Sequence, residues 1–270
     1  MDAVTTTTAG DLVARATAAL GVDARPTTVD GIDAGDPATV VTGVAVTTLA
    51  TLDVLERAVA AGANVVVTHE PPYFDHQGDQ VPVLVAEGDP VQAAKAAYVA
   101  EHGLVVWRVH DAWHDRRPDG VDAGTADALG WTLDPAEAAH GTAVCDVPAT
   151  TLGALARHVA DVLGSTQLRF AGDPDTPVRR VALDLGFRGF ARNRALLRRD
   201  DVDVVLVGEA HEWETASYAT DAARILGTGL VVVGHLPSEQ AGMSGFAAWL
   251  RDVVDVPVTF LPTPDLLRAV

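Results

Sequence analysis

Short apolar runs alternate with amphipathic segments along most of the chain. Runs rich in β-branched residues predict strands, and apolar residues spaced three and four apart predict helices. In the first half, strands are predicted at 40–46, 64–67 and 104–109, and helices at 10–20, 52–61, 89–102 and 125–129. A segment rich in proline and aspartate, which ends at Asp36-Pro37, is expected to be a loop.

The second half continues the alternation. Strands are predicted at 143–147, 168–171, 178–184, 202–207, 230–233 and 256–261, and helices at 150–163, 192–199, 212–226 and 239–253. Strands that alternate with helices favour an α/β protein. We expect two α/β lobes, 1–135 and 136–270, with mixed, mostly parallel sheets flanked by helices.

Composition narrows the class of protein and of partner. The 270 residues are 48% hydrophobic, which favours a compact globular protein with a large core. The net charge of -18 argues against nucleic acid and anionic membranes as partners. Cys145 is the only cysteine, so an intramolecular disulfide is excluded. The N-terminus lacks the features of a signal peptide and no run is long enough for a transmembrane helix, so we expect a cytoplasmic protein.

Three of the predicted strands end in polar residues that can bind metal. His69-Glu70 follow the strand 64–67, His110-Asp111 follow 104–109, and His235 follows 230–233. The carboxyl ends of strands border the ligand crevice in open α/β sheets. These side chains are therefore expected to meet in a metal cleft between the two lobes, to which the part 228–270 returns ligands.

Two further residues extend this set. His114 lies four residues after His110, and Glu239 lies four residues after His235, beyond a proline that favours a helix start. If that turn is helical, His235 and Glu239 point the same way. Imidazole and carboxylate ligands without sulfur suit zinc, iron, manganese or cobalt. Carboxylates also bridge paired ions about 3.5–4 Å apart, so two divalent ions are expected.

Each residue alone has a simpler explanation. A histidine at a strand end is more often a capping or core residue, Glu239 is a typical first-turn acid, and Asp111 is able to cap a turn. The simpler explanations do not account for histidine and acid pairs after three strands. The combination therefore favours a metal site.

A second group of candidates surrounds a fourth strand and a glycine-rich turn. Glu209 and His211 follow the strand 202–207 and are candidates for proton transfer or for support of the ligands. Solvated acids that open a helix are an equally good interpretation. Arg188 follows Gly186 and is a candidate for binding a phosphate or carboxylate, whereas the arginines after it are expected to pair with surface acids.

Three segments carry a resemblance to a known family. Asp30–Pro37 loosely resembles an opening Asp-x-x-Gly-x-x-x-Gly-Asp, Val65–Pro71 resembles an apolar strand followed by Thr-His-His-Pro, and Gly234–Glu239 resembles Gly-His-x-x-[Ser/Thr]-Glu. Together they resemble the Nif-three-like family of dinuclear-metal proteins, whose members are often named GTP cyclohydrolase 1 type 2. The resemblance implies that His69, His235 and Glu239 are metal ligands and that the chain forms a ring-shaped homohexamer.

The sequence departs from the family pattern at two places. Glu70 stands where the common pattern has a second histidine, and the family's ligand aspartate falls on His114. The chain resembles a branch with His-Glu-Pro and His-Asp-x-x-His motifs. Whether Asp111, His114 or both bind metal stays open.

The function implied is a metal-dependent hydrolase or cyclohydrolase acting on a small nucleotide-like or phosphorylated molecule. Glu70, Glu209 or His211 would transfer the proton, and Arg188 would meet an anionic group. The alternative is a non-catalytic protein that binds or delivers metal, or a scaffold. The chain has neither a P-loop nor a nicotinamide fingerprint, which argues against a kinase or a dehydrogenase.

Overall fold

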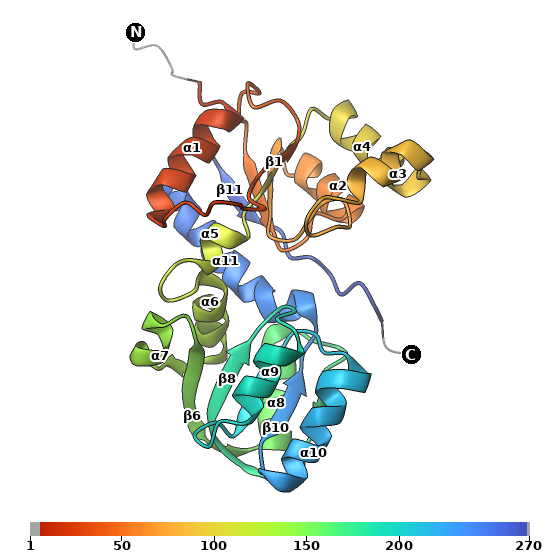
Figure 1. Ribbon diagram of the computed structural model, residues 1–270. Coiled ribbons are helices and arrows are strands. Elements are labelled where there is room, and N and C mark those ends of the chain that lie inside the picture. Colours follow the sequence, from red (N-terminus) through yellow and green to blue (C-terminus); the bar gives the residue numbers. More distant parts are fainter. Residues whose placement is uncertain (1–5, 269–270) are drawn as a thin grey trace. The chain divides into compact units, whose positions relative to one another are not determined.

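The computed structural model describes residues 6–268 and divides them into two compact units (Figure 1). The first unit runs up to Arg116 and adds Met243–Thr263, and the second comprises Arg117–Gly242 and the residues from Pro264 onward. The sequence pattern predicted one boundary between its two lobes, at 135/136. Among the described residues, no helix combines the length and apolar character needed to cross a membrane.

A five-stranded sheet forms the centre of the first unit. Its order is β1-β4-β3-β2-β11, and all neighbours are parallel except β1 and β4. The strands are β1 (Gly31–Ala34), β2 (Val44–Thr47), β3 (Val65–Thr68), β4 (Val105–Arg108) and β11 (Val258–Phe260). The central strands β2, β3 and β4 are buried on both faces, which explains their continuous valine-rich runs.

Helices cover this sheet. They are α1 (Ala9–Leu20), α2 (Leu52–Ala60), α3 (Val81–Glu87), α4 (Pro90–Glu101), α5 (Asp111–His114) and the second half of α11 (His235–Val253). On one face, Leu55 of α2 and Val99 of α4 join a buried cluster with strand residues such as Val66. Phe246 of α11 contacts Trp107 and Trp113, with ring centroids 6.1 and 5.0 Å apart.

The second unit has a six-stranded mixed sheet of order β5-β6-β8-β9-β10-β7. The pairs β8–β9 and β9–β10 are parallel and the other three are antiparallel. The strands are β5 (Thr132–Leu133), β6 (Ala143–Thr151), β7 (Arg169–Ala171), β8 (Pro177–Asp184), β9 (Val204–Val207) and β10 (Gly229–Val232). The expected α/β class, with mixed sheets flanked by helices, is thereby confirmed.

Helices also flank the second sheet, with α9 and α10 on the near side and α8 behind it in Figure 1. The helices are α6 (Gly120–Leu129), α7 (Pro135–Ala139), α8 (Leu152–Leu163), α9 (Phe190–Leu197), a π-helix at Glu212–Ala216, α10 (Ser217–Ile225) and the first half of α11. Leu197 of α9 and Ala219 of α10 pack on strand residues such as Val205. These contacts place the carboxyl ends of β8, β9 and β10 side by side.

The structure differs from the sequence-based elements in several places. Residues 31–34 form β1 within the segment expected to be a loop, α6 begins at Gly120 rather than 125, and α11 begins at His235 rather than 239. The short helices α3, α5 and α7 were not anticipated. Short elements of this kind carry too few apolar positions to show a period.

Candidate metal centre

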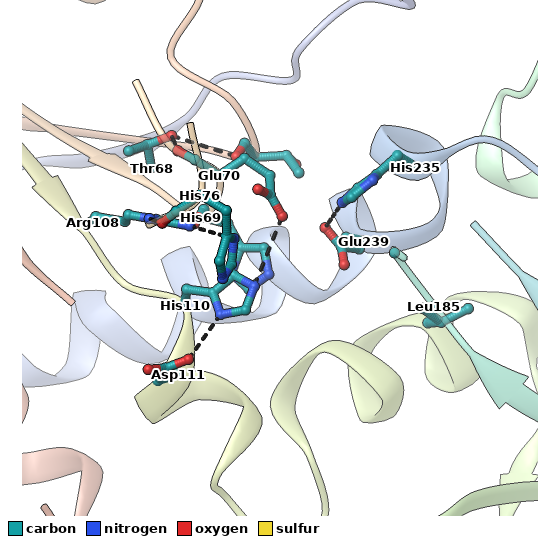
Figure 2. A network of polar contacts seen from close by, with 12 residues as sticks. Thr68, His69, Glu70, His76, Arg108, His110, Asp111, Leu185, His235 and Glu239 are labelled. Carbon is teal, nitrogen blue, oxygen red and sulfur yellow. Dashed lines mark hydrogen bonds and ion pairs between the residues drawn. The ribbon is translucent and has the colours of Figure 1, made fainter. Parts of the chain in front are cut away.

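Three histidines gather at the carboxyl ends of two neighbouring strands in the first unit, and Figure 2 labels two of them, His69 and His110. The parallel strands β3 and β4 are in register at Thr68 and Arg108. His69 follows β3 directly, and His110 begins the turn of α5, which ends at His114. Their ring centroids are 4.5 Å apart for His69 and His110, 5.0 Å for His69 and His114, and 4.8 Å for His110 and His114.

The triad His69, His110 and His114 has the spacing of a metal-binding group. Each histidine offers one ring nitrogen, and these atoms lie within 4.8 Å of one another. His69 is fully buried and His114 is 8% exposed. Burial, followed by the two neighbouring histidines, lowers the pKa of His110 to about 3. A neutral imidazole is the form that binds a metal, so the triad fits a divalent transition-metal ion.

Hydrogen bonds orient two of these rings. Nδ1 of His69 lies 3.0 Å from the carbonyl oxygen of Val109, and Nδ1 of His110 lies 3.1 Å from Oδ1 of Asp111. Because carbonyl and carboxylate oxygens only accept, both Nδ1 atoms carry the proton. The lone pair of each ring is thereby placed on Nε2, as is usual for histidines that bind metal.

Glu70 is another carboxylate of this unit that lies next to the triad, besides Asp111. Its Oε1 is 3.9 Å from Nε2 of His110, and its side chain is 13% exposed. In Figure 2 the Glu70 side chain points toward His110. This position suits either an additional metal ligand or a proton acceptor.

The structure adds two residues that the sequence did not indicate. Arg108, at the end of β4, is 3% exposed and donates through Nη1 to the carbonyl oxygen of His76 at 2.7 Å. Its Nη2 lies 2.9 Å from Nδ1 of His76, whose ring meets that of His110 edge-on at 4.8 Å. Arg108 therefore ties the loop after β3 to the histidine triad. The sequence signal that could have found Arg108 is a charged residue within a valine-rich run, because an arginine is rarely buried without a specific partner.

A second group of ligand candidates lies in the second unit. His235 and Glu239 occupy the first turn of α11, which follows β10. Nε2 of His235 is 3.4 Å from Oε2 of Glu239, and Nδ1 is 3.0 Å from Oε1 of Glu209 (Figure 2 shows His235 and Glu239). Glu239 is 2% exposed. The pair offers one nitrogen and one carboxylate to a metal, with Glu209 orienting the imidazole.

Two glycines and a serine set the geometry of this pair. Gly186 has φ +65°, and a Cβ atom there would lie 2.2 Å from Oε1 of Glu239. The hydroxyl of Ser238 accepts from the Gly186 amide at 3.0 Å and donates to the carbonyl of His235 at 2.6 Å. A Cβ on Gly208 would come within 2.6 Å of the same hydroxyl. These small residues allow the ends of β8 and β9 to approach the helix.

The remaining candidates are engaged elsewhere in the second unit. Nη2 of Arg188 lies 3.5 Å from Oδ2 of Asp119, and its Nε donates to the carbonyl of Leu185 at 3.3 Å. Nδ1 of His211 is 3.7 Å from Glu214. The imidazole of His211 is half exposed and stacks on Trp213.

A pocket of about 800 Å³ adjoins His235 within the second unit. Glu209 and His235 line it together with neighbouring residues that end or follow β9 and β10. Ser165, residues 167–169 and residues 265–267 complete the lining. This volume suits a small organic molecule.

Comparison of the sequence with known protein families identifies the family. The sequence model of the Duf34/NIF3 (NGG1p interacting factor 3) family matches residues 22–265. The chain belongs to the Duf34/NIF3 family. The Nif-three-like resemblance is thereby confirmed, whereas no curated protein matches the sequence significantly.

Solved structures of Duf34/NIF3-like chains share the fold. Staphylococcus aureus protein SA1388 is 18% identical, with a TM-score of 0.77 over 98% of this chain and 100% of that one. The protein ybgI, described as of unknown function, is 21% identical, with a TM-score of 0.72 over 96% and 99%. A Bacillus cereus protein related to NIF3 is 14% identical, with a TM-score of 0.76 over 98% and 99%. At these identities the likeness establishes the fold alone.

Proposed function

We propose that this Duf34/NIF3 protein binds two divalent transition-metal ions per chain and uses them in hydrolysis. The observation that carries the proposal is the buried triad of His69, His110 and His114, whose ring nitrogens lie within 4.8 Å of one another. In this proposal the triad holds one ion. His235 and Glu239 hold the other, and zinc, iron, manganese and cobalt all suit such nitrogen and oxygen ligands.

The proposed reaction is hydrolysis or ring opening of a small nucleotide-like or phosphorylated molecule. A bound divalent ion supplies Lewis acidity and a hydroxide source near neutral pH. Glu70 is the proposed proton acceptor, because its Oε1 lies 3.9 Å from Nε2 of His110, beside the triad. Glu209 is assigned to orienting His235, since its Oε1 lies 3.0 Å from the imidazole.

Arg188 and His211 receive no role in this proposal. Arg188 contacts Asp119 and the Leu185 carbonyl, so an anionic substrate would have to displace existing partners. His211 is half exposed beside Glu214 and Trp213. The pocket beside His235 provides the room for the substrate instead.

The first test is the metal content per chain after loading with zinc, manganese, iron(II) or cobalt. We expect about two ions in the unmodified protein, and about one in His69→Ala, His114→Ala, His235→Ala or Glu239→Ala. His158→Ala is the matched control, because Nε2 of His158 binds the carbonyl of Leu129 at 3.0 Å instead. Full metal content in all four variants would refute the proposed ligands.

The second test addresses hydrolysis separately. The loaded protein would be screened with nucleotides and phosphoesters, and Glu70→Gln would be compared with the unmodified chain at equal metal content. Turnover that needs metal and falls at least tenfold in Glu70→Gln supports the proposed proton acceptor. Bound, exchangeable metal without turnover of any compound would instead support a protein that binds or delivers metal.

A further inference from the structure

The segment 25–30, between α1 and β1, makes a set of polar contacts to the turn that carries His110 and His114. Asp30 accepts from three successive backbone amides of this turn. Its Oδ1 accepts from the amides of His110 at 2.7 Å and Asp111 at 2.8 Å, and its Oδ2 accepts from Ala112 at 2.8 Å. The carboxylate therefore fixes the start of α5.

Three other residues of the segment contact acidic side chains of the same turn. Arg25 donates to Asp115 through two bonds of 2.6 and 2.7 Å and pairs with Oδ1 of Asp111 at 2.9 Å. The hydroxyl of Thr28 and the amide of Val29 donate to Oδ2 of Asp111 at 3.0 and 3.2 Å. The segment 25–30 thus contacts the whole turn, from the amide of His110 to the side chain of Asp115.

Both carboxylate oxygens of Asp111 are used by these contacts. Oδ1 receives Arg25 and Nδ1 of His110, and Oδ2 receives Thr28 and Val29. Asp111 is 8% exposed. A carboxylate that already has two donors on each oxygen is poorly placed to bind a metal. It is well placed to hold the imidazole of His110 in one tautomer and orientation.

We infer that Asp111 is a positioning residue for His110, and that Asp30 and Arg25 preorganise the turn so that His110 and His114 present their nitrogens together. This inference rests on the proposed metal binding by the triad. It gives a role to the Asp30–Pro37 motif, and it assigns His114 rather than Asp111 as the ligand from this turn. Preorganisation matters because a ligand shell held by its neighbours loses less conformational entropy when the ion binds.

Cobalt(II) is the probe for this inference, because its visible spectrum reports the ligands around it. The titration would use the full chain carrying His235→Ala, so that the triad dominates binding. Asp30→Asn and Asp111→Ala would be compared with Asp89→Asn in the same background. Asp89 is the matched control because its carboxylate also caps a helix of the first unit, accepting from Val91 and Gln92 at 3.0 and 2.8 Å.

We expect Asp30→Asn and Asp111→Ala to weaken cobalt affinity about 10- to 100-fold, which is the usual effect of removing a residue that orients a ligand. Asp89→Asn should leave the affinity within about twofold. At saturating cobalt, Asp111→Ala should keep the band positions and intensity of its parent. Asp111→Asn, which keeps an acceptor oxygen, should recover part of the affinity and serves if the alanine variant does not fold.

Two results would overturn the inference. A changed cobalt spectrum in saturated Asp111→Ala would make Asp111 a ligand, and unchanged affinity in Asp30→Asn would remove the positioning role. Equal losses of affinity in Asp30→Asn and Asp89→Asn would mean that a general loss of stability, and not the positioning of the ligands, weakens binding. Failure of the parent chain to bind cobalt, or binding that survives His69→Ala, would instead refute the proposed metal site itself.

Discussion

His110, whose side chain is 18% exposed, lies between two other histidines and is held in its neutral form. Burial is the main cause that lowers its pKa from 6.5 to about 3, and His69 and His114 lower it further. Its imidazole is therefore ready to bind a metal without first losing a proton. The same environment makes the metal-free protein sensitive to acid.

The titration of His110 makes the folded protein less stable as the pH falls. Between pH 6.5 and about 3 the unfolded chain binds a proton at His110 that the folded chain does not, so lowering the pH favours unfolding. We expect this one group to remove about 2 kcal/mol of stability between pH 7 and pH 5. Urea denaturation of metal-free protein at both pH values, with and without His110→Gln, measures it. An equal loss in both chains would contradict the assignment.

Gly186 has no side chain, and the carboxylate of Glu239 occupies the space where a Cβ atom would lie. Gly186→Ala should cost about 1–2 kcal/mol through its left-handed backbone. It should also displace Glu239, because the new Cβ would lie 2.2 Å from Oε1. Gly164→Ala is the matched control, with φ +68° and no atom within 4 Å of its Cβ. Both variants should lose stability, but elemental analysis should find less metal only in Gly186→Ala. Full metal retention in Gly186→Ala would argue against the role of Glu239.

Helix α11 begins four residues earlier than the sequence indicated. Pro237 is compatible with this start because the first turn of a helix needs no amide donor there. His235 and Glu239 consequently stand one turn apart on the same helix, and their side chains approach to 3.4 Å. The condition attached to the sequence motif, that this turn be helical, is met.

Helices α6 and α11 cross with their backbones in contact at two glycines. A Cβ on Gly124 would lie 2.7 Å from the Cα of Gly242, and a Cβ on Gly242 would lie 2.5 Å from the Cα of Val121. Thr125 of α6 also donates to the carbonyl of Ser238 at 2.9 Å. This close crossing supports the first turns of α11, where His235 and Glu239 lie.

The close crossing of α6 and α11 leads to a prediction for the stability of variants in α11. Gly242→Ala should lower the free energy of unfolding by about 3 kcal/mol, since backbone atoms cannot move aside as a flexible side chain can. Gly245→Ala, in the same helix with nothing within 4 Å of its Cβ, should be neutral or stabilising by up to about 1 kcal/mol. Chemical denaturation of the two variants tests this. Similar stabilities would show that the helices separate at little cost.

At the scale of the whole molecule, bound metal should contribute to stability. An ion that binds only the folded chain adds about 3 kcal/mol when present at 100 times its dissociation constant. Removal of metal with a chelator should therefore lower the melting temperature by a few degrees. The difference should shrink in His69→Ala, which serves as the comparison in thermal unfolding. A melting temperature that does not respond to metal would contradict binding at structured sites.

The oligomeric state is the second prediction for the whole molecule. The family resemblance implies a homohexamer, and this stays a prediction that native mass measurement tests. At a net charge of -18, subunits repel one another at long range, so low salt should weaken any such assembly. A mass equal to one chain at all salt concentrations would contradict it.

By itself, the sequence determined the fold class, most central strands and the candidate residues for a metal site. Strands β3, β4, β9 and β10 were recognisable because buried parallel strands need continuous apolar runs, and each run ends where a polar residue begins. The same rule located His69, His110 and His235. It also predicted a metal cleft shared by two lobes, which stays a prediction.

Only the tertiary structure decided which contacts each of those residues makes. The turn of α5 is too short to show a helical period, and it depends on Asp30, some eighty residues away in sequence. Asp111 and His114 are equivalent candidates in the sequence, and the structure distinguishes Asp111 by the contacts that Arg25, Thr28 and Val29 make with its carboxylate. Contacts between distant segments have no local signature, so such distinctions arise only when the chain is folded.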